Sequence, residues 1–283
     1  MEVLTNVLVN AIKGFAKERL YGRMLRNMKV EQLLTNRKGD DSRRAFCIVH
    51  WNAPHFLLLN VKRLELLHPE SKIYVFDNAS SEANLKAALS GLKGYKNVTL
   101  FSNKRDYSHT WACHIMGLQF LLNYAAQRSD SIAIFLDQDC ILVNRVDDLI
   151  DKLDGKETLL IGVRDRAVGV HGSFMMMQPV VIYGLFGDQS LIDGKAFETY
   201  QGIARKATGK TLFLEMQKHP EIPLLTRYMY RGKTYAWHSW YSSRIVGMKD
   251  TDVLDGLPVS WLKDSLKKAY AFMELLPAEQ GVQ

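Results

Sequence analysis

The residues best suited to chemistry are the two aspartates of Asp137-Gln138-Asp139, which directly follow the apolar run from Ile132 to Leu136. Carboxylates two positions apart at a strand end can place one oxygen on a substrate hydroxyl and another on a divalent cation. Hard cations such as Mg²⁺ and Mn²⁺ take oxygen ligands and commonly share them with phosphates. A purely structural turn is the alternative, since Asp favours turns. The same spacing in Asp250-Thr251-Asp252 follows no apolar run and predicts a surface turn.

A second polar segment, Asp77-Asn78-Ala79-Ser80-Ser81, ends the strand expected from Lys72 to Phe76 in the same way. Asp77 could accept a hydrogen bond from a nucleobase or a ribose. Equally, Asp and Asn stabilise turns, and either serine could cap the helix that follows. The residues alone leave both interpretations open.

The elements that must position these side chains alternate between short apolar strands and helices. Strands are expected at 45–49, 72–76, 98–101 and 132–136, and helices at 56–67, 82–92 and from 110 onward. Such alternation predicts parallel strands joined by right-handed crossovers, with ligands at the carboxyl ends of the strands. The polar residues expected at those ends are Asn52, Asp77, Asn78, Ser102, Asp137 and Asp139. Less regular strands at 159–163 and 180–183 and helices near 195–207 and 260–275 follow.

Three strand-end motifs together resemble the GT-A-fold glycosyltransferases, in particular the family-2-like group, over residues 45–145. They are Val49-His50-Trp51-Asn52, Phe76-Asp77-Asn78-Ala79-Ser80-Ser81 and Leu136-Asp137-Gln138-Asp139. The resemblance implies an α/β fold with a Rossmann-like, mixed, mostly parallel sheet flanked by helices. It also implies a nucleoside-diphosphate sugar as donor, Mn²⁺ or Mg²⁺ as cofactor, and transfer to a saccharide, lipid-linked or protein acceptor.

By the same resemblance, Asp77 would contact the base, Asp137 the ribose or sugar, and Asp139 the metal. Asn52, Asn78 and Arg105 complete the expected donor site, although Arg105 could also belong to a helix cap. His238 resembles the late histidine that GT-A enzymes often supply to the metal, with a packed histidine among aromatic residues as the alternative.

The residue that accepts the proton in the reaction is the one that the sequence identifies least clearly. Inverting transfer needs a carboxylate to take the proton of the acceptor hydroxyl. The acidic pair usual in family-2 enzymes is absent after the metal motif, and the available candidates are Asp188, Glu198 and Glu215. Glu198, after the turn-like Asp193-Gly194-Lys195, is preferred, with Asp188 second. The segment 171–174, expected to follow a turn, is assigned to the acceptor side.

The positive charge of the chain is concentrated near its start. Residues 1–38 carry eight Lys and Arg against three Glu, which accounts for +5 of the net charge of +7. The balanced remainder argues against nucleic-acid binding. Apolar residues at helical spacing predict a basic amphipathic helical segment over 1–40, which could lie on an anionic membrane or pack on the body. A catalytic domain is expected over 41–283, with 41–145 binding the nucleotide sugar and 146–283 forming the acceptor side.

The composition bounds the remaining classes. With 47% hydrophobic and 24% charged residues, the chain is neither disordered nor a small disulfide scaffold. Three widely spaced cysteines, no apolar run near the roughly 20 residues of a membrane span and no secretory signal predict a cytoplasmic protein, with peripheral contact at the inner face of a membrane through residues 1–38. Two alternatives to a glycosyltransferase are a nucleotidyltransferase, although His50-Trp51-Asn52-Ala53-Pro54 lacks a Gly-rich phosphate loop, and a non-catalytic adaptor at a membrane surface.

Overall fold

The computed structural model describes most of the chain after its first 27 residues. The described residues are 28–36, 44–103, 110–128, 130–153, 157–165, 169–179, 210–242, 244–245 and 247–277. Several predictions fall outside them: residues 1–27 and 37–40 of the basic helical segment expected over 1–40, Arg105, Asp188 and Glu198, and the elements expected at 180–183 and 195–207.

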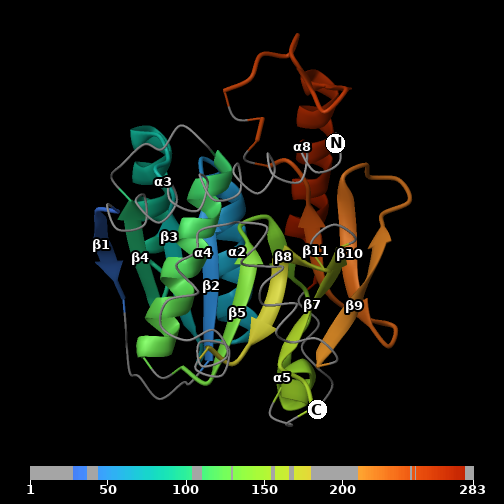
Figure 1. Ribbon diagram of the computed structural model, residues 1–283. Coiled ribbons are helices and arrows are strands. Elements are labelled where there is room, and N and C mark those ends of the chain that lie inside the picture. Colours follow the sequence, from blue (N-terminus) through green and yellow to red (C-terminus); the bar gives the residue numbers. More distant parts are fainter. Residues whose placement is uncertain are drawn as a thin grey trace, which may run out of the picture.

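Four parallel strands form one end of the large sheet, with three helices in the connections between them (Figure 1). The strands are β2 (Arg44–His50), β3 (Lys72–Asp77), β4 (Val98–Asn103) and β5 (Ile132–Asp137), and the helices are α2 (Pro54–Leu67), α3 (Glu82–Leu92) and α4 (Thr110–Gln127). Their order in the sheet is β4-β3-β2-β5, and each pairs in parallel with its neighbour. All carboxyl ends therefore meet at one edge, as the alternating pattern predicts.

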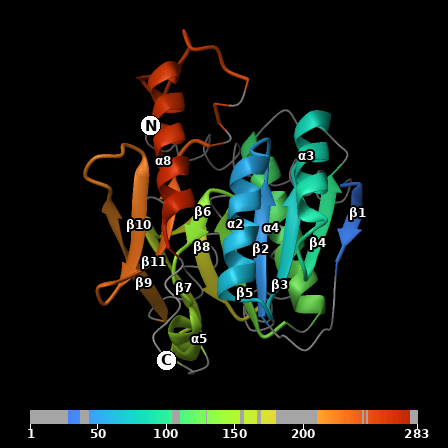
Figure 2. The same cartoon turned by 180° about the vertical axis from the view of Figure 1, so that it is seen from behind.

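The helices lie on both faces of the sheet, with α4 on one and α2 and α3 on the other (Figure 2). Alternate residues of β2 point to opposite faces, so Cys47 packs with α4 while Ile48 packs with α2. A strand covered on both sides must be apolar throughout, which explains the uninterrupted run in β2. Helix α4 comes close to the sheet at Gly117, where a Cβ would lie 2.7 Å from Phe76.

The second half of the chain extends the sheet with mostly antiparallel pairings. Its elements are β6 (Cys140–Leu142), α5 (Asp147–Leu153), β7 (Leu160–Asp165), β8 (Gly169–Met177), β9 (Thr211–Lys218), β10 (Leu225–Tyr230), β11 (Lys233–Ser239), β12 (Val253–Leu254), β13 (Leu257–Pro258) and α8 (Val259–Leu275). The full order of the large sheet is β1-β4-β3-β2-β5-β8-β7-β9-β10-β11-β6. A mixed sheet with a parallel core, flanked by helices, confirms the predicted fold class.

The first described element corrects the prediction of a helical segment over 1–40 for residues 30–35 alone. Residues 30–35 form the edge strand β1 (Val30–Thr35), which pairs antiparallel with β4. Leu33 and Leu34 pack against the core below α3. These residues form a strand and not a helix, because the open edge of β4 offers unpaired backbone groups.

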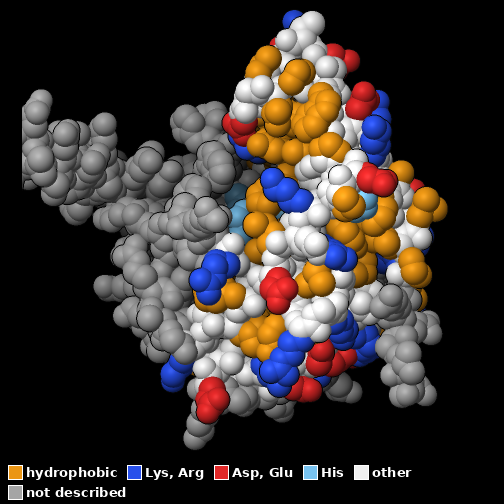
Figure 3. Space-filling view, turned by 90° about the vertical axis from the view of Figure 1, so that its right-hand side faces the viewer, with side chains coloured by type: hydrophobic (Ala, Val, Ile, Leu, Met, Phe, Trp, Pro, Cys, Tyr) orange, Lys and Arg blue, Asp and Glu red, His pale blue; other side chains and the backbone are white. Residues whose placement is uncertain are grey.

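The face that carries β9, β10 and α8 exposes apolar side chains between Lys and Arg (Figure 3). The exposed apolar residues of these elements include Met216 of β9 and Trp261 and Leu275 of α8, with 51%, 40% and 83% of their surface exposed. Among the described residues, no helix combines the length and apolar character needed to cross a membrane.

His68 makes folding stability dependent on pH. The ring is 1% exposed, and its Nε2 accepts a hydrogen bond from the backbone N–H of Val146 at 3.3 Å. Burial lowers the pKa of His68 from 6.5 to about 4, against the opposing charge of Asp147. Between pH 6.5 and pH 4 the unfolded chain therefore binds a proton at His68 that the native protein does not bind. The contribution of His68 to the free energy of unfolding is complete above pH 6.5 and is lost as the pH falls towards 4.

We expect the free energy of unfolding to be about 2 kcal/mol lower at pH 5 than at pH 8 because of His68. Urea unfolding of the wild type and of His68→Gln at both values measures it, because Gln can accept the same hydrogen bond without titrating. The expected result is a smaller loss in the variant. Equal losses in both proteins would show that His68 does not carry this pH dependence.

Candidate metal centre at the carboxyl end of strand β5

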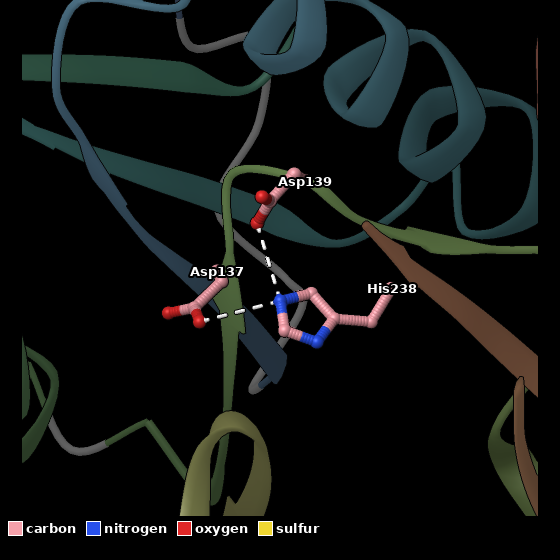
Figure 4. A group of neighbouring side chains, drawn as sticks. All are labelled: Asp137, Asp139 and His238. Atoms are coloured by element: carbon pink, nitrogen blue, oxygen red, sulfur yellow. Dashed lines mark ion pairs between the residues drawn. The ribbon is translucent and has the colours of Figure 1, made fainter. Parts of the chain in front are cut away.

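Asp137, Asp139 and His238 come together at the end of β5 (Figure 4). His238 Nε2 lies 3.7 Å from Asp137 Oδ2 and 3.4 Å from Asp139 Oδ1, and one ligand atom from each residue lies within 4.8 Å of the others. Neighbouring ligands around one cation at about 2.1 Å are separated by about 3 Å. A small closure of these side chains would therefore place all three around a single ion.

Gln138 explains why both aspartates face the same side. Its side chain points the other way, where Oε1 accepts hydrogen bonds from Trp51 N at 2.9 Å and His50 Nδ1 at 2.6 Å. Its Nε2 donates to Trp51 O and to Ser242 Oγ. Gln138 and Asp139 form the turn that follows β5, and burial of the Gln138 side chain on one side of this turn leaves the carboxylates of Asp137 and Asp139 on the side of His238.

A buried side chain of α2 holds the turn itself. Asn60 Nδ2 lies 3.0–3.3 Å from the carbonyl oxygens of Asp137, Gln138 and Cys140 and donates hydrogen bonds to them. The turn between β5 and β6 thus has its carbonyl groups satisfied within the protein. The sequence singled out neither Asn60 nor Gln138, whose roles follow from contacts between separate elements.

The pairing of β6 with β11 places His238 beside the aspartates. Cys140, the residue after Asp139, is opposite His238 in this antiparallel pair, and Ser239 N donates to Asp139 O at 3.1 Å. The register of two strands nearly a hundred residues apart therefore joins the late histidine to the strand-end acids. This is the grouping that the family resemblance implies for Asp139 and His238.

The two carboxylates of the site favour a positive charge beside them. Burial lowers the pKa of His238, but the Asp139 and Asp137 carboxylates outweigh it, and the net shift is upward. The His238 and Asp139 side chains are 3% and 8% exposed, whereas that of Asp137 is 23% exposed. The group is thus a buried site of negative character, open to a ligand on the side of Asp137, and suited to a cation.

Two further side chains complete its surroundings. His114, near the start of α4, places Nε2 3.5 Å from Asp137 Oδ1 and is 34% exposed. Trp240 packs its ring on His238 with centroids 4.7 Å apart and donates from Nε1 to Thr226 Oγ1. The sequence analysis assigned no role to His114, because nothing in its spacing links it to Asp137.

Asp77, one of the residues expected to bind the donor, is buried and hydrogen-bonded within the protein. Asp77 is fully buried, and its Oδ2 accepts hydrogen bonds from Ser80 N at 3.3 Å and Ser102 Oγ at 3.2 Å. Its Oδ1 lies 3.9 Å from His50 Nε2, and burial lowers the pKa of His50 against the opposing charge of Asp77. Asp77 thus binds its own loop and β4 here, and contact with a base stays a prediction.

Asn52 and Asn78 differ in how they are engaged. Asn52 has a positive φ of 52°, and its Oδ1 accepts from Ser81 N at 2.7 Å and Asn84 Nδ2 at 3.1 Å. It therefore ties the loop after β2 to the start of α3. The Asn78 side chain is buried, and its Oδ1 has no hydrogen-bond partner within the described part of the chain.

Two acceptor-side assignments take a different form from the one expected. Residues 171–174 lie within strand β8, so no turn follows Val170, and His171 packs its ring 4.9 Å from that of Trp240. In place of the turn expected after Val170, β8 has an irregularity here: Gly162 of β7 is opposite Met175 and Val163 is opposite His171, so residues 172–174 have no partner in β7. Glu215 is exposed on β9 and does not belong to the Asp–Asp–His group.

Comparisons with known proteins identify similar folds but no relative by sequence. No protein-family model and no curated protein matches this chain. Among solved structures, it resembles a mannosyltransferase from Pyrobaculum calidifontis in complex with GDP-Man and Mn²⁺, at 14% identity and a TM-score of 0.44, over 73% of this chain and 64% of that one. It also resembles the galactosyltransferase LgtC in complex with donor and acceptor sugar analogues, at 16% identity and a TM-score of 0.41, over 60% and 72%.

A third similar structure is TarS of S. aureus, at 9% identity and a TM-score of 0.47, over 84% of this chain and 44% of that one. The chain thus spans less than two thirds of the mannosyltransferase and of TarS. The similar structures are glycosyltransferases, and the functional assignment below rests on the site described here.

Proposed function

We propose that this protein is a metal-dependent glycosyltransferase that moves a sugar from a nucleoside-diphosphate sugar to a saccharide, lipid-linked or protein acceptor. The observation that carries the proposal is the Asp137–Asp139–His238 group at the carboxyl edge of a parallel sheet. This is the edge where α/β folds bind their ligands. The strand-end motifs that resemble GT-A enzymes surround the same edge.

The donor set fits a divalent cation. Two carboxylates and one imidazole offer two hard ligands and one borderline ligand, a mixture that favours Mn²⁺ over the strictly oxygen-seeking Mg²⁺. When bound, such a cation stabilises the negative charge that accumulates on a departing diphosphate. The partly exposed Asp137 and His114 would border the donor, and burial of His238 and Asp139 keeps water from their ligand atoms.

Asp77, Asn78, Asn52 and Arg105 are proposed for the nucleotide, and Glu198 or Asp188 for the proton of the acceptor. These assignments follow the family resemblance. For Asp77 the described geometry adds one requirement: the Asp77 side chain has no exposed surface, so a base could reach the carboxylate only after the residues that cover it move.

A thermal-shift panel of nucleoside diphosphates and their sugars, each with and without Mn²⁺, tests the proposal. A ligand at 100 times its Kd adds about 2.7 kcal/mol, which raises the Tm of a protein of this size by on the order of 5 °C. We expect one nucleotide to give this shift only when Mn²⁺ is present. A flat panel with folded protein would contradict the proposal and favour the adaptor alternative.

A further inference from the structure

A continuous chain of hydrogen bonds leads from His238 away from the metal centre. His238 Nδ1 lies 2.7 Å from Tyr228 Oη, and Tyr228 Oη lies 2.7 Å from Ser173 Oγ. Ser173 Oγ in turn lies 2.8 Å from His171 Nδ1. The chain crosses from β11 through β10 to β8, and the Tyr228 and Ser173 side chains are fully buried. The protons of the Tyr228 and Ser173 hydroxyls are therefore oriented by contacts within the protein.

A backbone N–H group fixes the donor-to-acceptor direction of this chain of hydrogen bonds. Ser173 N–H also points at His171 Nδ1, at 3.1 Å, and a backbone N–H can only donate. His171 Nδ1 must therefore carry a lone pair. The Ser173 hydroxyl, 2.8 Å from the same nitrogen, has to donate its one proton to it, because the opposite orientation would face two lone pairs.

The remaining protons follow in order. Once Ser173 Oγ has donated to His171, it can only accept from Tyr228, so the Tyr228 hydroxyl donates to Ser173. The phenol has no second proton, so towards His238 Nδ1 its oxygen is the acceptor. His238 must then carry a proton on Nδ1, and in the neutral ring Nε2 holds the lone pair that faces Asp137 and Asp139.

From this geometry we infer that Tyr228, oriented by Ser173, is a positioning residue that sets the tautomer and ring orientation of His238 for metal binding through Nε2. The inference deepens the proposed function and rests on its metal centre. Metal-binding histidines commonly donate the other ring nitrogen to a fixed acceptor, and loss of that acceptor costs 10–100-fold in metal affinity. Trp240, packed against the same ring at a tilt of 54°, limits its rotation from the side.

Two measurements on the full-length protein test the inference. The first is nitrogen-15 NMR of the metal-free protein, at a pH high enough to leave His238 neutral. We expect the wild type to show a protonated Nδ1 and an unprotonated Nε2, and Tyr228→Phe to populate the opposite tautomer. The second is the Kd for Mn²⁺ alone, from the electron paramagnetic resonance signal of the free ion, which should rise about 10–100-fold in Tyr228→Phe.

Tyr235→Phe is the matched control. Tyr235 is equally buried, on neighbouring β11, and its hydroxyl binds Asp148 rather than the metal centre. We expect its Kd for Mn²⁺ and its His238 tautomer to equal those of the wild type. If Tyr228→Phe does not fold, Ser173→Ala replaces it, since losing the serine hydroxyl frees the phenol proton to turn towards His238 and should produce the same changes.

The outcomes separate this inference from the proposed function. Failure of the wild type to bind Mn²⁺ would overturn the metal centre, whereas the tautomer of His238 would still decide whether Tyr228 orients it. A wild-type ring protonated on Nε2 alone would overturn the inference. So would a Kd for Mn²⁺ that Tyr228→Phe and Ser173→Ala leave unchanged.

Discussion

Asp139→Asn is expected to reduce Mn²⁺-dependent cleavage of the nucleotide sugar by on the order of 10²–10³-fold. The substitution keeps the shape of the side chain and removes one negative charge from a site where His238 Nε2 lies 3.4 Å from Asp139 Oδ1. A bound cation contributes several kcal/mol of charge stabilisation in such reactions, and each 1.36 kcal/mol corresponds to tenfold in rate. Losing a carboxylate ligand removes most of this contribution.

The measurement is initial-rate hydrolysis of the donor that the thermal panel selects, together with the Kd for Mn²⁺. Asp250→Asn is the matched control, because Asp250-Thr251-Asp252 has the same spacing on the surface, where Asp250 forms an ion pair with Lys263. The control should match the wild type in both readouts. Asp139→Asn should keep a cooperative unfolding transition, since a strand-end ligand contributes little to the core. Full activity and unchanged Mn²⁺ binding in this variant would exclude Asp139 as a ligand.

Lys72→Met is expected to have the largest effect on stability, a loss of about 3–5 kcal/mol in unfolding free energy. Lys72 Nζ lies 2.7 Å from Asp130 Oδ1, and Tyr74 Oη donates to Asp130 Oδ2 at 3.0 Å. Asp130 is only 1% exposed. Without the lysine, a buried carboxylate loses its compensating charge at the point where β3 meets the turn before β5.

Urea unfolding measures the loss, which corresponds to a Tm lower by roughly 10 °C. The double variant Lys72→Met/Asp130→Asn should recover much of the stability, because a neutral amide no longer needs a countercharge and can still accept from Tyr74. Lys267→Met is the control: its ion pair with Asp264 has both side chains at least 70% exposed, and such pairs contribute little. An unfolding midpoint for Lys72→Met equal to that of this control would refute the prediction.

Local patterns predicted the parallel half of the fold well. The uninterrupted apolar runs in β2, β3, β4 and β5 are typical of strands covered on both faces, and the helices between them have enough length to cross the sheet. Strand β1 was misread as part of a helix, since a short apolar segment takes its conformation from the open sheet edge it meets. Strands β9 and β10 were not predicted, because many of their residues are exposed or half-buried and carry only a weak alternation.

The sequence by itself determined that Asp137 and Asp139 end a buried strand at the ligand-binding edge of a parallel sheet, because both facts follow from residues within one short segment. It also marked His238 through the family resemblance, without a geometric link to the acids. Only the tertiary structure decided that link, through the register that sets His238 opposite Cys140, and the inward turn of Gln138 that aligns the two carboxylates. The proton order of the Ser173–Tyr228–His238 chain was decided there as well, because hydrogen bonds between three strands depend on distances that no local spacing records.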